Sequence, residues 1–120
     1  MDEAMLSRPA MTAVTLLFGD GEYTFNLTWG CVVEWEKTTG RSLFATFKAM
    51  LSGGDIPLEC IRETIRLGLI GGGMAPVDAL KKVKFYVEGR PFAESYGTAL
   101  AIAGAALFGA DKIEAAVAEG

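Results

Sequence analysis

The chain has 120 residues, a formal net charge of −4 at pH 7, no histidine and two cysteines, and 51% of its residues are hydrophobic. This length fits one domain with a sizeable hydrophobic core. The acidic balance argues against a nucleic-acid partner, and the absence of histidine excludes the common Cys/His zinc sites and the Ser/His or Cys/His catalytic pairs within one chain.

The two ends of the chain and its most apolar run indicate the limits of the domain and whether the protein has a signal peptide or a membrane-spanning helix. Residues 1–9 open with acidic residues and lack the apolar stretch of a signal peptide, so we predict a disordered N-terminus there. The most apolar run, residues 98–110, is shorter than the roughly 20 residues that a membrane-spanning helix needs. We therefore expect no membrane partner, one α+β domain over residues 10–110, and a short helical or frayed tail over residues 111–120.

An antiparallel β-hairpin is predicted first, with strands over residues 12–18 and 22–28. The apolar residues of both strands repeat with a period of two, which is typical of half-buried strands. They are Val14, Leu16, Phe18, Tyr23, Phe25 and Leu27. The intervening Gly19-Asp20-Gly21 suits a tight turn. Because a lone hairpin is marginal in water, its apolar face must find helices or the strands of a partner.

About five mostly short helices are predicted after the hairpin, packed with it as one domain. The first covers about residues 29–38, and the fifth covers about residues 92–108. Their start signals are Thr28, Ser42, Pro57, Pro76 and Pro91. Their stop signals are the glycines at positions 40, 53–54, 71–73, 89 and 109. The fold class is therefore α+β, with the hairpin at the N-terminal end.

The middle three helices each carry an apolar stripe at helical spacing. The stripes are Leu43, Phe47, Met50 and Leu51, then Leu58, Ile61, Ile65 and Leu69, then Val77, Leu80, Val83 and Val87. Charged residues fall on other faces, with weak ion pairs expected among Glu59, Arg62, Glu63 and Arg66 and solvated side chains at Lys81, Lys82 and Lys84. Cys31 and Cys60 are expected to act as small core hydrophobes.

No set of residues indicates an enzyme or a cofactor site. The glycine-rich segment at residues 68–73 invites comparison with a phosphate-binding loop, but Met74 stands where that motif needs lysine, and the segment follows a helix. A flexible connector, or a loop close to a partner, is the alternative interpretation. Glu34 and Glu36 are two apart on a predicted helix, so they point to different sides and cannot form a catalytic pair.

The order of several motifs carries a family resemblance. They are Phe25-Asn26-Leu27-Thr28-Trp29-Gly30, Thr39-Gly40-Arg41-Ser42-Leu43, the segment 67–76 with its glycines, methionine and proline, Tyr86-Val87-Glu88-Gly89-Arg90-Pro91, and Leu107-Phe108-Gly109. Over residues 14–109 the chain resembles the small gene-transfer-agent tail protein family, also described as a phage tail assembly chaperone family. The resemblance implies a non-enzymatic role in building a tail, with no known catalytic residue to transfer.

Two functions follow from this resemblance. The first is an assembly chaperone that binds tape-measure and tail-tube proteins in the bacterial cytoplasm during particle assembly. The second is a structural, tube-associated component that self-associates, which places the protein in the virion tail. Tube subunits usually need an extended β-sandwich or barrel, and only one hairpin is evident, so the sequence favours the chaperone.

Eight residues are predicted to bind the partner protein. A chaperone would cover the apolar stripe of a tape-measure helix in a groove, and a hairpin edge could add a strand to the sheet of a partner. The candidates on the hairpin, the glycine loop and the fifth helix are Phe25, Gly71, Gly72, Gly73, Met74, Gly97, Ala101 and Gly104.

Overall fold

The computed structural model describes residues 11–119, with side chains described through residue 114. The N-terminus predicted to be disordered lies outside the described residues. In chain order the elements are β1 (Ala13–Phe18), β2 (Gly21–Asn26), α2 (Trp29–Thr39), α3 (Leu43–Ser52), α4 (Leu58–Gly71), α5 (Pro76–Val83), the π-helical η1 (Lys84–Glu88), the 3-10 helix η2 (Phe92–Ser95), α6 (Tyr96–Phe108) and α7 (Ala110–Glu119). The predicted α+β fold, a hairpin followed by helices, is confirmed.

The two strands form an antiparallel pair in which Phe18 faces Gly21 and Val14 faces Phe25. Gly19 turns the chain with a φ of 59°, in the left-handed region that glycine enters without a steric penalty. Val14, Phe18 and Phe25 are buried on one face of the hairpin, while Thr15 and Leu17 are exposed on the other. The hairpin therefore has one face on the core and one in solvent, as its period of two predicts.

The helix boundaries follow local capping signals. Thr28 caps α2 by accepting a hydrogen bond from the backbone N–H of Cys31, and Ser42 caps α3 by accepting one from Ala45. Gly40 and Gly53 end these two helices in the left-handed conformation. The sequence predicted these starts and stops because caps depend on residues only a few positions apart.

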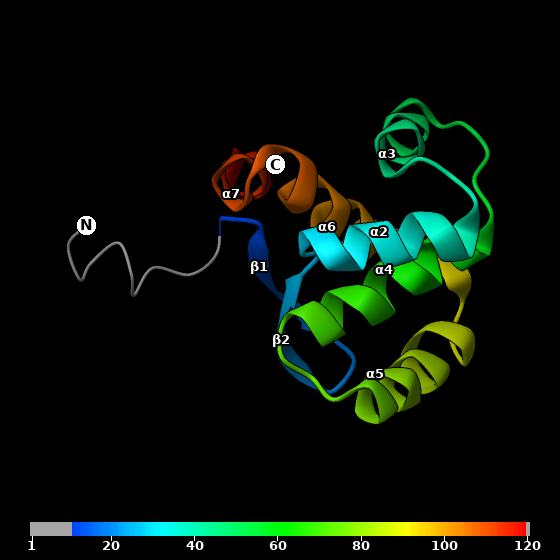
Figure 1. Ribbon diagram of the computed structural model, residues 1–120. Coiled ribbons are helices and arrows are strands. Elements are labelled where there is room, and N and C mark those ends of the chain that lie inside the picture. The colour runs from blue at the N-terminus through cyan, green and yellow to red at the C-terminus, as the bar shows by residue number, and fades with distance from the viewer. Residues whose placement is uncertain (1–10, 120) are drawn as a thin grey trace.

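Helix α4 lies at the centre of the molecule. It packs against β2, α2, α5 and α6, and α6 in turn packs against β1, α3 and α7 (Figure 1). Ile61, Ile65 and Leu69 form its buried stripe, as predicted. The hairpin is thus held between α4 and α6, which supply the helices that its apolar face requires.

Three residues predicted to face inward are instead exposed: Leu51, Leu58 and Val77. Each lies in the first or last turn of its helix, beyond the reach of the elements that cover the middle of that helix. On α5 the buried residues are Ala79 and Val83, so the buried stripe is rotated away from Val77. The spacing correctly predicted that each helix has a buried apolar stripe, but it extended the stripes into terminal turns that are exposed.

The fourth and fifth predicted helices are also less regular than expected. The fourth continues from α5 into the π-helical η1, and the fifth begins as the short 3-10 helix η2 before α6. None of the helices in the described part of the chain is long and apolar enough to cross a bilayer.

Candidate functional site

Gly71 and Gly72, two of the predicted partner-binding residues, contact β2. A Cβ atom on Gly71 would lie 1.8 Å from the carbonyl oxygen of Asn26, and one on Gly72 would lie 2.0 Å from that of Thr24. Real Cβ atoms essentially never approach other atoms so closely, so the absence of side chains at both positions allows α4 to end against the strand. The two glycines cover these carbonyls on the edge of β2 that faces away from β1.

The other two residues of the glycine loop lie further from the core. Gly73 has a φ of 113° and open space around its Cα atom. Met74 is half-buried, and its backbone N–H donates a hydrogen bond to the carbonyl of Leu69 at 3.0 Å. Met74 also lines a groove of about 490 Å³ together with Phe85 and Tyr86, so Gly73 and Met74 are the loop candidates that border open space.

The remaining candidates are scattered over the molecule. Phe25 is fully buried and packs edge-on against Phe18, with ring centroids 5.8 Å apart. A Cβ atom on Gly104 would lie 2.5 Å from Ile113 of α7 and 3.1 Å from Phe47 of α3. The space beside Gly104 is therefore filled by other helices of the same chain. Gly97 is exposed on α6, and Ala101 is half-buried. The eight residues therefore do not form one surface in the monomer.

The outer edge of β1 is the hairpin edge that lies away from β2. The two-residue turn makes Phe18 and Gly21 the closing hydrogen-bonded pair, so Leu16 and Val14 also bond to β2. By alternation, the backbone N–H and C=O groups of Ala13, Thr15 and Leu17 point away from β2. None of these groups bonds to another described backbone group outside the strand pair.

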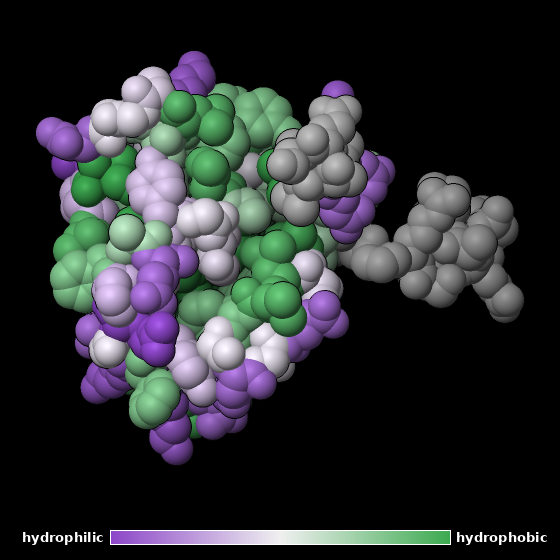
Figure 2. Space-filling view, turned by 180° about the vertical axis from the view of Figure 1, so that it is seen from behind, coloured by the Kyte–Doolittle hydropathy of each residue, from purple (hydrophilic) through white to green (hydrophobic). Residues whose placement is uncertain are grey.

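Large apolar side chains are exposed on several elements. Trp29 at the start of α2 is 87% exposed, and Leu17 on β1 is 79% exposed. The others are Met11, Val33, Phe44, Leu51, Leu58, Val77, Phe85, Phe92 and Phe108. Figure 2 shows hydrophobic side chains gathered in several places on the rear face, separated by polar ones. Exposed aromatic residues are typical anchors of protein interfaces.

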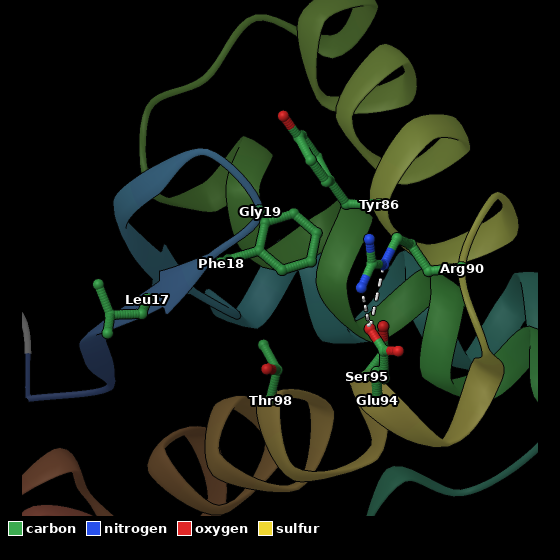
Figure 3. A pocket seen from close by; sticks show the side chains of 8 residues that line it. All are labelled: Leu17, Phe18, Gly19, Tyr86, Arg90, Glu94, Ser95 and Thr98. Atoms are coloured by element: carbon green, nitrogen blue, oxygen red, sulfur yellow. Dashed lines mark hydrogen bonds and ion pairs between the residues drawn. The ribbon is translucent and has the colours of Figure 1, made fainter.

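Two grooves border these exposed residues. The more apolar one, of about 410 Å³, lies between α4 and η1–η2 and is lined by Leu58, Ile61, Val87 and Phe92, with Arg62 and Glu88 at its side. The second, of about 300 Å³, lies between the hairpin turn and α6 (Figure 3). There Arg90 and Glu94 form an ion pair at 3.0 Å, so the pocket offers no unpaired charge to a small ligand.

Glu63 forms ion pairs with Arg62 and Arg66, as predicted, but it is buried, with only 1% of the residue exposed. Its carboxylate accepts hydrogen bonds from Arg62 at 2.8 Å and from Arg66 at 2.7 and 2.9 Å. Arg62 also donates to Glu88 at 2.6 Å, which joins α4 to η1. These interactions satisfy the buried carboxylate and raise the pKa of Arg66, so the cluster is a structural ion-pair network.

A second charged cluster ties the hairpin turn to α5. Lys82 contacts Asp20 at 3.0 Å and lies 5.2 Å from the ring centre of Tyr23. Hydrogen bonds from Tyr23 and Lys82 hold the pKa of Asp20 below its ordinary value, and the contacts with Tyr23 and Asp20 raise the pKa of Lys82. Both residues are therefore charged at neutral pH and attract each other across 62 positions of sequence.

The described residues contain no cluster of three or more His, Cys, Asp or Glu side chains that could hold a metal ion. Both cysteines are free thiols; Cys60 is buried and Cys31 is half-buried. Burial raises the pKa of the Cys60 thiol, which keeps it protonated and unreactive at neutral pH. The prediction of small core hydrophobes describes Cys60 well and Cys31 in part.

Sequence reasoning missed the exposure of Leu17 and Trp29. The signal for Leu17 was present, because Leu16-Leu17-Phe18 interrupts the alternation and one of these apolar residues must face solvent. The signal for Trp29 was weaker: it occupies the first helical position, directly after the capping Thr28.

The fold defines a small α+β protein whose described surface carries several large exposed apolar side chains. A family model described as "Phage tail tube protein, GTA-gp10" matches residues 11–109, and the chain belongs to this family. The protein is accordingly a tail component of the phage and gene-transfer-agent type, as the resemblance implied. No curated protein and no solved structure matches the chain.

Proposed function

We propose that the protein is a structural, tube-associated tail component that self-associates in the particle. The observation that carries this proposal is the family match, whose description names a tail tube protein and which covers most of the chain. It favours the structural alternative over the assembly chaperone that the sequence analysis preferred.

The surface of the molecule supports a role in assembly. Leu17 and Trp29 are largely exposed on different elements, and the outward backbone groups of β1 have no backbone partner outside the strand pair within residues 11–119. Subunits of an assembly bury such features against one another, whereas a protein that acts alone gains nothing from exposing them. Assembly in the bacterial cytoplasm, followed by retention in the virion tail, is part of the proposal.

One observation favours the chaperone as a second candidate. The described residues contain a single two-stranded sheet, which is less β-structure than a tube subunit usually has. A chaperone that binds tape-measure and tube proteins would need no larger sheet. The two candidates differ in one measurable respect, because a structural component stays in the finished particle and a chaperone leaves it.

Quantitative mass spectrometry on purified particles and on the lysate of producing cells tests the proposal. We expect many copies of the protein per particle, in a fixed ratio to the major capsid protein, which serves as an internal reference. A protein that is abundant in the lysate and absent from finished particles would overturn the structural proposal and support the chaperone.

A further inference from the structure

The two outer edges of the hairpin differ in whether another described element covers their backbone groups. On β2 the outward carbonyls of Thr24 and Asn26 are covered by Gly72 and Gly71 at the end of α4. On β1 the outward backbone groups of Ala13, Thr15 and Leu17 have no backbone partner outside the strand pair among the described residues. At the start of this edge the carbonyl of Met11 accepts a hydrogen bond from Ala110 at 2.7 Å, so the free stretch is 13–17.

The free edge also lacks the usual protection against pairing. Natural edge strands carry charged residues, proline or bulges that prevent contact with another sheet. The sequence of β1 is Ala-Val-Thr-Leu-Leu-Phe, with no charge and no proline, and it pairs with β2 without a bulge. Figure 1 shows β1 at the side of the described part of the molecule. An edge of this kind is suited to forming further backbone hydrogen bonds.

We propose that β1 pairs with β1 of a second copy of the chain, antiparallel, about a two-fold axis that passes between the two Thr15 residues. In this register Thr15 faces Thr15 of the second copy. Leu17 of each copy faces Ala13 of the other. These are the residues whose N–H and C=O groups point outward, so the contact gains about six hydrogen bonds. The result is a four-stranded sheet of order β2-β1-β1-β2, a common size for sheets.

The side chains on the solvent face match this register. Each exposed Leu17 would lie beside the small Ala13 of the other copy, which leaves space for the leucine at the two ends of the contact. Thr15 already contacts Thr24 within one copy, with 3.0 Å between the hydroxyl oxygens, so pairing produces a row of four threonines across the sheet. Threonine pairs stabilise neighbouring strands, and no like charges oppose each other across the axis.

The small size of the contact indicates a weak dimer. The six residues of β1 extend over about 20 Å, so the strand edge alone buries less surface than the interfaces of stable dimers. We therefore expect a dimer that dissociates on dilution. A two-fold contact uses the same patch on both copies and closes at two, so any larger ring must use other surfaces.

This inference deepens the proposed self-association and rests on it for its role in the particle. The test uses the purified full chain, so its failure is distinguishable from a failure to find the protein in particles. Sedimentation velocity over a concentration series should show a monomer–dimer equilibrium for the wild type. Leu17→Lys should weaken the dimer at least tenfold, because it places two like charges at the edge.

Leu51→Lys is the matched control, since Leu51 is 63% exposed on α3, away from the hairpin. It should leave the equilibrium unchanged, and far-UV circular dichroism should show that both variants fold. A wild type that stays monomeric up to about 1 mM overturns the proposal, as does a dimer that Leu17→Lys does not weaken.

Cross-linking tests the register separately. In a Cys31→Ser background, Thr15→Cys should form an intermolecular disulfide under mild oxidation, since directly opposed residues in a hydrogen-bonded pair lie about 5.5 Å apart at Cα. Thr24→Cys, on the same face but on β2, should not. Equal cross-linking of the two variants would overturn the two-fold register.

Discussion

At the scale of single residues, Gly72 shows how closely this fold is packed. Its Cα atom lies so near the carbonyl of Thr24 that an added Cβ would be 2.0 Å from the oxygen. The added Cβ would meet backbone atoms of Thr24. The backbone of a hydrogen-bonded hairpin cannot move aside as a flexible side chain can. We predict that Gly72→Ala lowers the free energy of unfolding by about 2 kcal/mol or more, which urea denaturation measures.

Gly97 provides the matched control for this prediction. It lies in α6, it is exposed, and an added Cβ would meet no atom within 4 Å. Alanine has the higher helix propensity, so Gly97→Ala should raise the free energy of unfolding by about 0.5 to 1 kcal/mol. If both substitutions shift the urea midpoint in the same direction, the packing argument for Gly72 is wrong.

Glu63 illustrates a different kind of residue-scale constraint. A buried carboxylate is costly to desolvate, but here Arg62 and Arg66 supply charged donors to both of its oxygens. No buried side-chain nitrogen or oxygen in the described part of the chain lacks a hydrogen-bond partner. The burial of Glu63 is therefore explained by its pairing, and the network gives α4 and η1 a defined relative position through Arg62 and Glu88.

At the scale of elements, the hairpin turn is attached to α5 through Asp20 and Lys82. Because the pKa of Asp20 is lowered below 3.8 in the folded state, its contribution to stability is present above pH 3.8 and is lost as the pH falls through the lower, folded value. We predict that wild type loses more stability than Asp20→Asn between pH 5 and pH 2. Urea midpoints across this range measure the difference.

The control for this pH prediction is Asp55→Asn, in the exposed loop before α4, where no ion pair is formed within the described residues. Its pH profile should follow that of the wild type. An Asp20→Asn profile that is parallel to the wild type would show that the contact between the turn and α5 contributes nothing to folding.

At the scale of the whole molecule, one hydrophobic core connects the hairpin, the α-helices up to the start of α7, and η1. The buried hydrophobic residues form a single cluster that includes Val14, Phe25, Trp35, Ile65 and Ala110. A domain with one core of this kind is expected to unfold in a single cooperative transition. The helices and the hairpin should therefore be lost together.

The two tryptophans make this prediction easy to test. Trp35 is fully buried and donates a hydrogen bond to Thr64 at 3.0 Å, whereas Trp29 is exposed. In a Trp29→Phe variant the fluorescence reports on Trp35 in the core alone, and far-UV circular dichroism reports mainly on the helices. The two urea transitions should coincide. Midpoints that differ beyond error would mean that part of the molecule unfolds separately.

The sequence predicted the local features of this fold well. Thr28, Ser42, Gly40 and Gly53 are the caps that the structure shows, and the hairpin turn at Gly19 is where the strand pattern placed it. Each of these features depends on residues within about four positions of one another. Of the eight predicted binding residues, the sequence could not show which would face solvent.

The sequence by itself thus determined the fold class, the caps of the first two helices and, through its motifs, the tail protein family. Only the tertiary structure decided that Glu63 is buried, that Gly71 and Gly72 close one edge of the hairpin, and that no other described element pairs with the edge at Thr15. The physical reason is range. Caps, turns and periodicity act between near neighbours, whereas burial and edge coverage depend on elements that meet only after the chain has folded.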